Sequence, residues 1–182
     1  MRKLALSLAA PMLCALAVPM TPAYADESTE ALIAARDAAA QARDDMVEAF
    51  DTSEIKPGKY LWRDPGDAVG EPRVVISISD QTAYLYRGGM LVAVSSVSTG
   101  KDGNPTPIGI FPVLAKKEMH FSKKYDNAPM PFMQRLDNYG IAMHAGANPG
   151  YPASRGCVRL PAGFAKKLFA VTRTGTEVVI GS

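Results

Sequence analysis

The spacing of apolar positions along residues 26–50 differs from the spacing in the chain from residue 73 onward. Over residues 26–50 the apolar positions recur at steps of three and four, which predicts a helix that Ser28 can cap. The seam is narrow and mostly alanine: Leu32, Ala35, Ala39, Ala42, Met46 and Ala49. Because alanine buries little area, we expect the helix to rest on the remaining domain or to act as a spacer. A dimer contact is the alternative.

From residue 73 onward the pattern changes to short alternating runs, as in half-buried strands. The expected strands are 74–80, 82–87, 91–100, 108–116, 139–146 and 174–182. An irregular crossing precedes the first of these strands. The second strand ends in an expected hairpin turn over Arg87–Met90, which contains two glycines. One short amphipathic helix is expected at 162–172, with Phe164, Leu168 and Val171 inward. The pattern therefore predicts a mainly β domain over 57–182, preceded by a helical segment and linker over 26–56.

The stretch 116–138 is long for a connection within a compact domain, so we expect a loop that covers a substrate. Its apolar side chains Tyr125, Met130 and Phe132 are the candidate lid residues. The alternative is a loop packed flat over the core.

Residues 1–25 have the layout of a secretory signal peptide. Arg2 and Lys3 precede an apolar run, and small residues before and at Ala25 suit cleavage after that position. We therefore expect an exported protein of the periplasm or cell envelope, without a transmembrane span after cleavage. Lipidation at Cys14 is an alternative, but the residues before it fit poorly.

Removal of the signal peptide also balances the charge. The full chain has 20 Lys and Arg against 18 Asp and Glu, and Arg2 and Lys3 leave with the signal. A neutral balance gives no reason to propose nucleic acid as a partner.

The same cleavage leaves Cys157 as the single cysteine. An unpaired thiol in an oxidising compartment is at risk of oxidation, so we expect a functional reason for it; a buried, inert cysteine is the alternative. His144 stands thirteen positions upstream, at the end of an expected strand, and the residues between them are rich in turn formers. We expect His144 to lie beside the sulfur, as a general base or as the imidazolium of an ion pair, although a structural histidine is the alternative. The backbone carbonyl of Ala145 is the candidate that orients the imidazole.

The residues around the thiol suit acyl chemistry. Gly156 permits close approach to a reacting carbonyl, and its N–H and that of Cys157 are candidates for an oxyanion hole. Arg155 and Arg159 share the face of the thiol in an extended stretch, where they would lower its pKa and hold a substrate carboxylate. Ser154 either bonds to His144 or shapes the turn.

These residues resemble a known family. "MHAG…SRGCVRLP" is similar to the catalytic motif of L,D-transpeptidases, and "STGKDGNPTPIGIFPV" resembles the family's upstream loop. The resemblance covers about 73–182 and implies a β-sandwich or barrel-like catalytic domain with one short helix after the cysteine. Arg155 stands where many members have histidine, while the family's catalytic histidine matches His144.

The resemblance implies an enzyme that acts on peptidoglycan tetrapeptide stems as donor and acceptor. The cysteine would attack the carbonyl of the third residue, commonly meso-diaminopimelate, releasing D-alanine and leaving a thioester. An amine of a second stem would then form a 3→3 crosslink. No metal or organic cofactor is implied, and carbapenems are expected to acylate the cysteine.

The sequence leaves several rival functions open. Some use the same cysteine and histidine, and others give the cysteine no catalytic role. An L,D-endopeptidase or carboxypeptidase would admit water, and related enzymes exchange D-amino acids or attach a lipoprotein acceptor. Papain-like enzymes place cysteine before histidine, and sortases have a longer gap between the two. A wall-binding module would leave Cys157 inert. A metal site would have only His120, His144 and Cys157 as soft ligands.

Overall fold

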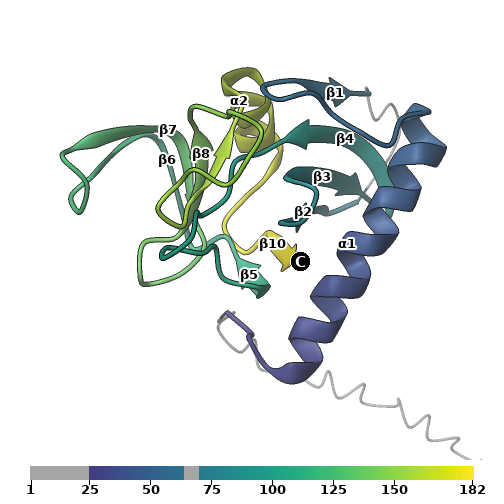
Figure 1. The fold of residues 1–182 in the computed structure, drawn as a ribbon, viewed down its shortest axis with the longest axis horizontal. Helices are drawn as coiled ribbons and strands as arrows, with labels where there is room; N and C mark the ends of the chain where they lie inside the picture. The colour runs from purple at the N-terminus through teal and green to yellow at the C-terminus, as the bar shows by residue number, and fades with distance from the viewer. Residues whose placement is uncertain (1–24, 64–69) are drawn as a thin grey trace, which may run out of the picture.

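The computed structural model describes residues 25–63 and 70–182 as two β-sheets with two helices (Figure 1). The predicted signal peptide, apart from Ala25, and the middle of the expected irregular crossing lie outside the described residues. The elements are α1 Thr29–Phe50, β1 Tyr60–Trp62, β2 Pro72–Ser77, β3 Thr82–Arg87, β4 Met90–Ser96, β5 Gly109–Pro112, β6 Ala115–Ser122, β7 Ala128–Arg135, β8 Ala142–Ala145, β9 Val158–Leu160, α2 Ala162–Val171 and β10 Glu177–Gly181. Within these residues, no helix has the length and apolar character needed to cross a bilayer.

The strands form a six-stranded sheet in the order β1-β4-β3-β2-β10-β5 and a four-stranded sheet in the order β6-β7-β8-β9. Only β10–β2 and β8–β9 are parallel pairs among the described strands. The predicted mainly β class, with an N-terminal helix and a short helix after the cysteine, is confirmed.

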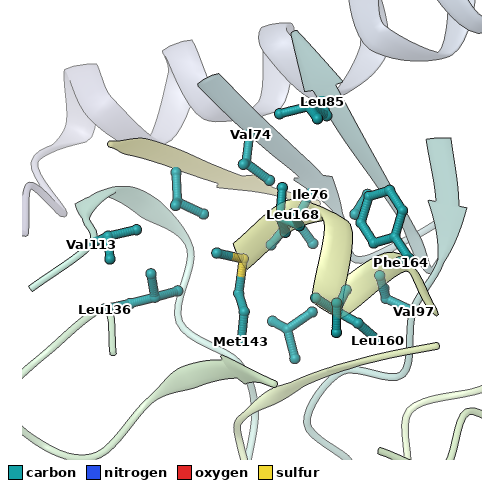
Figure 2. Packing of buried hydrophobic residues seen from close by; sticks show 14 of the residues in the cluster. Val74, Ile76, Leu85, Val97, Val113, Leu136, Met143, Leu160, Phe164 and Leu168 are labelled. Atoms are coloured by element: carbon teal, nitrogen blue, oxygen red, sulfur yellow. The ribbon is translucent and has the colours of Figure 1, made fainter. Parts of the chain in front are cut away.

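The main core lies between the two sheets and α2 (Figure 2). Phe164 and Leu168 of α2 are fully buried there, as the amphipathic pattern predicts, whereas Val171 is only partly buried. Lys116 of β6 donates to the carbonyl oxygens of Phe169 and Thr172 at the end of α2. This contact satisfies carbonyls that the last turn of a helix leaves free.

The β3–β4 hairpin has the predicted two-residue turn. Gly88 and Gly89 have φ of 55° and 84°, and Arg87 pairs with Met90. Positive φ at both central positions is typical of a type I′ turn, which suits the twist of the flanking strands.

The expectation of half-buried strands is wrong for β2 and β3, because α1 covers the second face of the sheet. Tyr84 and Val75 are buried in a second apolar cluster with the alanine seam of α1. At Gly181 an added Cβ would lie 2.2 Å from the Ala35 carbonyl oxygen, so the helix and β10 are in very close contact. The seam is therefore occupied by the sheet and not free for a dimer. Leu32 is exposed, and Ala31 takes its place in the seam.

The stretch 116–138 is mostly a long β-hairpin and not the expected loop. β6 and β7 pair from Ala115 and Arg135 to Ser122 and Ala128, and the hairpin projects away from the six-stranded sheet (Figure 1). Backbone hydrogen bonds along the ladder hold this stretch, together with the packing of Met130 and Met133 beside Ala142 and of Phe132 against α2.

Candidate active site

The four-stranded sheet brings Cys157 and His144 to one face. In the parallel pair β8–β9, Met143 pairs with Val158 and His144 pairs with Arg159. Met143 and Val158 point into the main core. Because side chains alternate along a strand, His144, Arg159 and Cys157 face the opposite side. The register thus brings the thiol and the imidazole that the sequence singles out to the same face of neighbouring strands, where the thiol donates its own hydrogen bond to the Gly140 carbonyl oxygen at 3.6 Å.

That face is the floor of a cleft of about 800 Å³. The β6–β7 hairpin, the segment 138–142 and the segment 146–155 line it, together with His144 and Cys157. His144 is 8% exposed, and Cys157 is half-buried and free of any disulfide. The sulfur is thus neither isolated from solvent nor fully exposed, which suits a nucleophile that receives a peptide.

The imidazole of His144 has the orienting contact that the sequence predicts. Its Nδ1 lies 2.9 Å from the carbonyl oxygen of Ala145. A carbonyl only accepts hydrogen bonds, so Nδ1 carries the proton and donates it. The lone pair is therefore on Nε2, and the imidazole in this tautomer can accept a proton there.

Burial is the largest influence on both reacting groups. Burial raises the pKa of the Cys157 thiol, and the negative charge of Asp137 raises it further. A backbone hydrogen bond from Ala142 and the positive charges of Arg159 and Lys124 lower it. The expected depression of the thiol pKa by Arg159 is therefore outweighed, because the sulfur packs beside Met130, Met133 and Ala142, and Arg155 is not among the groups that shift this pKa.

Burial also lowers the pKa of His144. The hydrogen bond to Ala145 opposes this shift, and the positive charges of Arg159 and His120 add to it. A thiol with a raised pKa beside an imidazole with a lowered pKa favours the neutral pair at neutral pH. Of the two roles left open by the sequence, the electrostatics favour general base over resting ion pair.

Ser154 holds the backbone of the cysteine loop and does not bond to His144. Its Oγ donates to the Cys157 carbonyl at 2.5 Å and accepts the Gly156 N–H at 3.1 Å. The Gly156 N–H is therefore already used, which leaves the Cys157 N–H as the expected oxyanion donor. Gly156 itself has φ of 112°, and a Cβ there would lie 2.8 Å from Ile141 Cδ1. The positive φ requires glycine at this position, whereas the flexible end of the Ile141 side chain could move aside.

The loop 98–106 supports the cysteine loop, a role that the sequence reasoning did not assign to it. Thr106 Oγ1 accepts the Gly100 N–H at 2.8 Å and donates to the Gly156 carbonyl at 2.7 Å. Ser98 and Arg159 exchange two backbone hydrogen bonds of 3.0 Å each. The threonine in the "TPIGIF" motif was the available signal, because a buried hydroxyl in a turn needs partners.

The three expected lid residues separate into two groups. Tyr125 and Met130 line the cleft, and Arg155 lies over the Tyr125 ring at 4.8 Å. Phe132 instead packs against Phe169 of α2, with ring centroids 5.9 Å apart. His120, which the sequence reasoning considered only as a metal ligand, pairs with Met130 across the hairpin and lines the cleft. Across residues 25–63 and 70–182, no three His, Cys, Asp or Glu side chains gather as a metal site.

Comparison with known proteins places this site in a family. The family model of the L,D-transpeptidase catalytic domain (YkuD) matches residues 71–180. No match was found among curated proteins. Among solved structures, an L,D-transpeptidase from Mycobacterium smegmatis has a TM-score of 0.58 and 20% identity, covering 62% of this chain and 59% of that one.

Two further structures are similar. That of the L,D-transpeptidase of Xylanimonas cellulosilytica (TM-score 0.56, 25% identity) covers 63% of this chain and 62% of that one. L,D-transpeptidase 3 from Mycobacterium tuberculosis, in complex with a faropenem-derived adduct (TM-score 0.55, 22% identity), covers 61% of each chain. The present chain thus spans about three fifths of the length of these structures. From the match over 71–180, this chain belongs to the L,D-transpeptidase catalytic domain family.

Proposed function

We propose that this chain is a cysteine-dependent L,D-transpeptidase of the bacterial envelope, which forms 3→3 crosslinks between peptidoglycan stems. The observation that carries the proposal is the placement of Cys157 and His144 on one face of β8 and β9, inside a cleft large enough for a peptide. Family membership and the β-lactam adduct of a relative support it. The signal-like residues 1–25 support export of the protein.

In the acylation step, His144 Nε2 takes the thiol proton while the sulfur of Cys157 attacks the carbonyl of the third stem residue. A C–S bond forms, and the tetrahedral oxyanion accepts hydrogen bonds from the oxyanion site, for which the Cys157 N–H is the candidate donor. The bond to D-alanine then breaks, and the imidazolium returns the proton to the leaving amine. The products are a thioester on Cys157 and free D-alanine.

In the second step, the side-chain amine of an acceptor stem attacks the thioester. His144 takes the amine proton and returns it to the departing sulfur, so the enzyme ends as it began. Water as the acceptor would give L,D-carboxypeptidase or endopeptidase products, and a lipoprotein amine would give attachment to the wall. The same two residues serve each outcome, so the products identify the reaction.

Mass spectrometry tests the proposal directly. Purified protein is incubated with a carbapenem, and the peptide carrying Cys157 is examined for the added mass; Cys157→Ala is the control. Incubation with tetrapeptide-stem muropeptides then reports the products. A 3→3 dimer with released D-alanine is the expected result. An unmodified Cys157 together with unchanged muropeptides would contradict the proposal, and tripeptides without dimers would identify a hydrolase.

A further inference from the structure

The cleft around Cys157 has a large excess of positive charge. One carboxylate, that of Asp126, is among its lining residues. The cations that line it are Lys117, Lys123, Lys124, Arg135, Arg155 and Arg159. Beyond the expected signal peptide the sequence has equal numbers of acidic and basic residues, so this excess is local.

These six cations also lack carboxylate partners. The ion pairs among the described residues use Arg36, Arg43, Arg73 and Arg173, all of them outside the cleft. Like charges gathered without partners around a concave surface repel one another, and a bound anion relieves this repulsion. The cleft is therefore arranged for a ligand with more than one negative charge.

The register places two of these cations, both exposed, on the hairpin side of the cleft: Arg135 on β7 and Lys117 on β6. Arg135 pairs with Ala142, and Cys157 precedes Val158, the partner of Met143. Arg135 is thus two strands away from Cys157, which corresponds to about 10 Å between their backbones. Lys117 pairs with Met133, beside which the sulfur packs. Both cations lie on the hairpin side of the cleft, opposite Arg159.

The donor stem of the proposed reaction offers the matching anions. A stem with meso-diaminopimelate in third position and D-alanine in fourth has a terminal carboxylate and, at the end of the diaminopimelate side chain, a carboxylate beside the ammonium group that supplies the acceptor amine in the second step. These groups lie on either side of the carbonyl that Cys157 attacks. Two carboxylates within reach of cations on both sides of the thiol make charge-assisted contacts that an amide cannot replace.

We propose that this cleft selects stems whose diaminopimelate side-chain carboxylate is free over stems in which it is amidated, with Arg135 and Lys117 as the specificity-determining residues. The inference rests on the proposed function. Amidation removes this negative charge and leaves the side-chain end with only its ammonium, which the exposed cations Arg135 and Lys117 repel. Salt weakens the selection, because the Debye length falls from about 10 Å at 0.1 M to about 3 Å at 1 M.

The test compares two synthetic tetrapeptide stems that differ only in this group, carboxylate or carboxamide. D-Alanine release gives kcat/KM for each, and we expect the free acid to be preferred by about tenfold or more at low salt. Arg135→Gln and Lys117→Gln reduce this ratio, and together bring it towards one. Arg173→Gln, a matched loss of charge outside the cleft, keeps the wild-type ratio. Thermal melting checks that each variant is folded.

Equal kcat/KM for the two stems, or a preference for the amide, would overturn the proposal. The proposal would also be overturned if the folded double variant, Arg135→Gln with Lys117→Gln, kept the wild-type ratio of kcat/KM between the two stems. Carbapenem acylation of the wild-type protein separates this result from failure of the proposed function. If Cys157 is acylated and the stems are processed without discrimination, the specificity proposal is wrong and the catalytic proposal stands. If neither reaction occurs, both are wrong.

Discussion

Ser154 Oγ donates a 2.5 Å hydrogen bond to the backbone carbonyl of Cys157 and also accepts the N–H of Gly156. One buried hydroxyl therefore closes the turn that presents the nucleophile. The backbone of Ser154 is held in the same place, because its N–H donates to the Thr99 carbonyl at 2.9 Å. The position of the sulfur thus depends on contacts made by a residue that does not touch it.

Replacing Ser154 with alanine removes both side-chain bonds and leaves the buried Gly156 N–H without an acceptor. We expect Ser154→Ala to lower the rate of Cys157 acylation by about 10-fold or more, and the free energy of unfolding by about 1–3 kcal/mol. Stopped-flow acylation by a carbapenem and urea denaturation measure the two effects. Ser154→Thr, which keeps the hydroxyl, is the control and should retain much of the rate. An alanine variant as fast as wild type would show that the turn needs no hydroxyl.

The pH dependence of Cys157 chemistry follows from the directions of the two pKa shifts. Burial raises the thiol pKa and lowers the imidazole pKa. Carbapenem acylation needs neutral His144 as the base, so its rate should fall with acid only below the ordinary histidine pKa of about 6.5. Alkylation by iodoacetamide needs the thiolate, so its rate should rise with a midpoint above the ordinary thiol pKa of about 8.5.

A resting ion pair predicts the opposite alkylation profile, with fast and nearly constant alkylation at pH 6 to 7. His144→Ala serves as a control in both experiments. Its acylation should be slow at every pH, whereas its thiol still titrates above the ordinary value, because burial is the main cause of the shift. Rapid alkylation of the wild-type protein at neutral pH would show that the thiol and the imidazole do not rest as the neutral pair.

The sequence predicted those parts of the molecule that depend on local pattern. The two glycines of the β3–β4 turn, the cap at Ser28 and the inward face of α2 could be found because short-range geometry decides them. Burial of Tyr84 could not be found, because it depends on a helix more than thirty residues away in the chain. Alternation predicted one buried face, and α1 provided a second.

The site shows the same limit. His144 and Cys157 could be singled out as candidates because thiols and imidazoles are rare in this chain and stand in a motif. The direction in which the pKa of Cys157 shifts was not predicted. The sequence shows the neighbouring charges but does not show that the thiol is buried beside Met130 and Met133. Phe132 was expected at a lid, but the β6–β7 pairing is interrupted at this residue, where φ is 54°, and its ring packs against Phe169 of α2.

The position of Phe132 gives a separate prediction about the hairpin. Since its ring packs against Phe169, Phe132→Ala should lower the free energy of unfolding by about 1–3 kcal/mol, less than for a fully buried phenylalanine. KM for a stem peptide should change little, because the side chain does not line the cleft. Tyr125→Ala, which removes a ring that does line the cleft, should show the reverse. A large rise in KM for Phe132→Ala without loss of stability would support the original lid assignment.

The contact between α1 and β10 gives the sharpest prediction about the fold. An added Cβ at Gly181 would lie 2.2 Å from the Ala35 carbonyl oxygen and 2.9 Å from the Ala39 Cβ, and helix backbone cannot move aside as a flexible side chain can. We expect Gly181→Ala to lower the free energy of unfolding by about 1–3 kcal/mol, measured by urea denaturation. Ser182→Ala, at the exposed neighbouring position, should change it little. If α1 were only a spacer, both variants would unfold at the wild-type midpoint, and the close packing of the alanine seam would contribute nothing to stability.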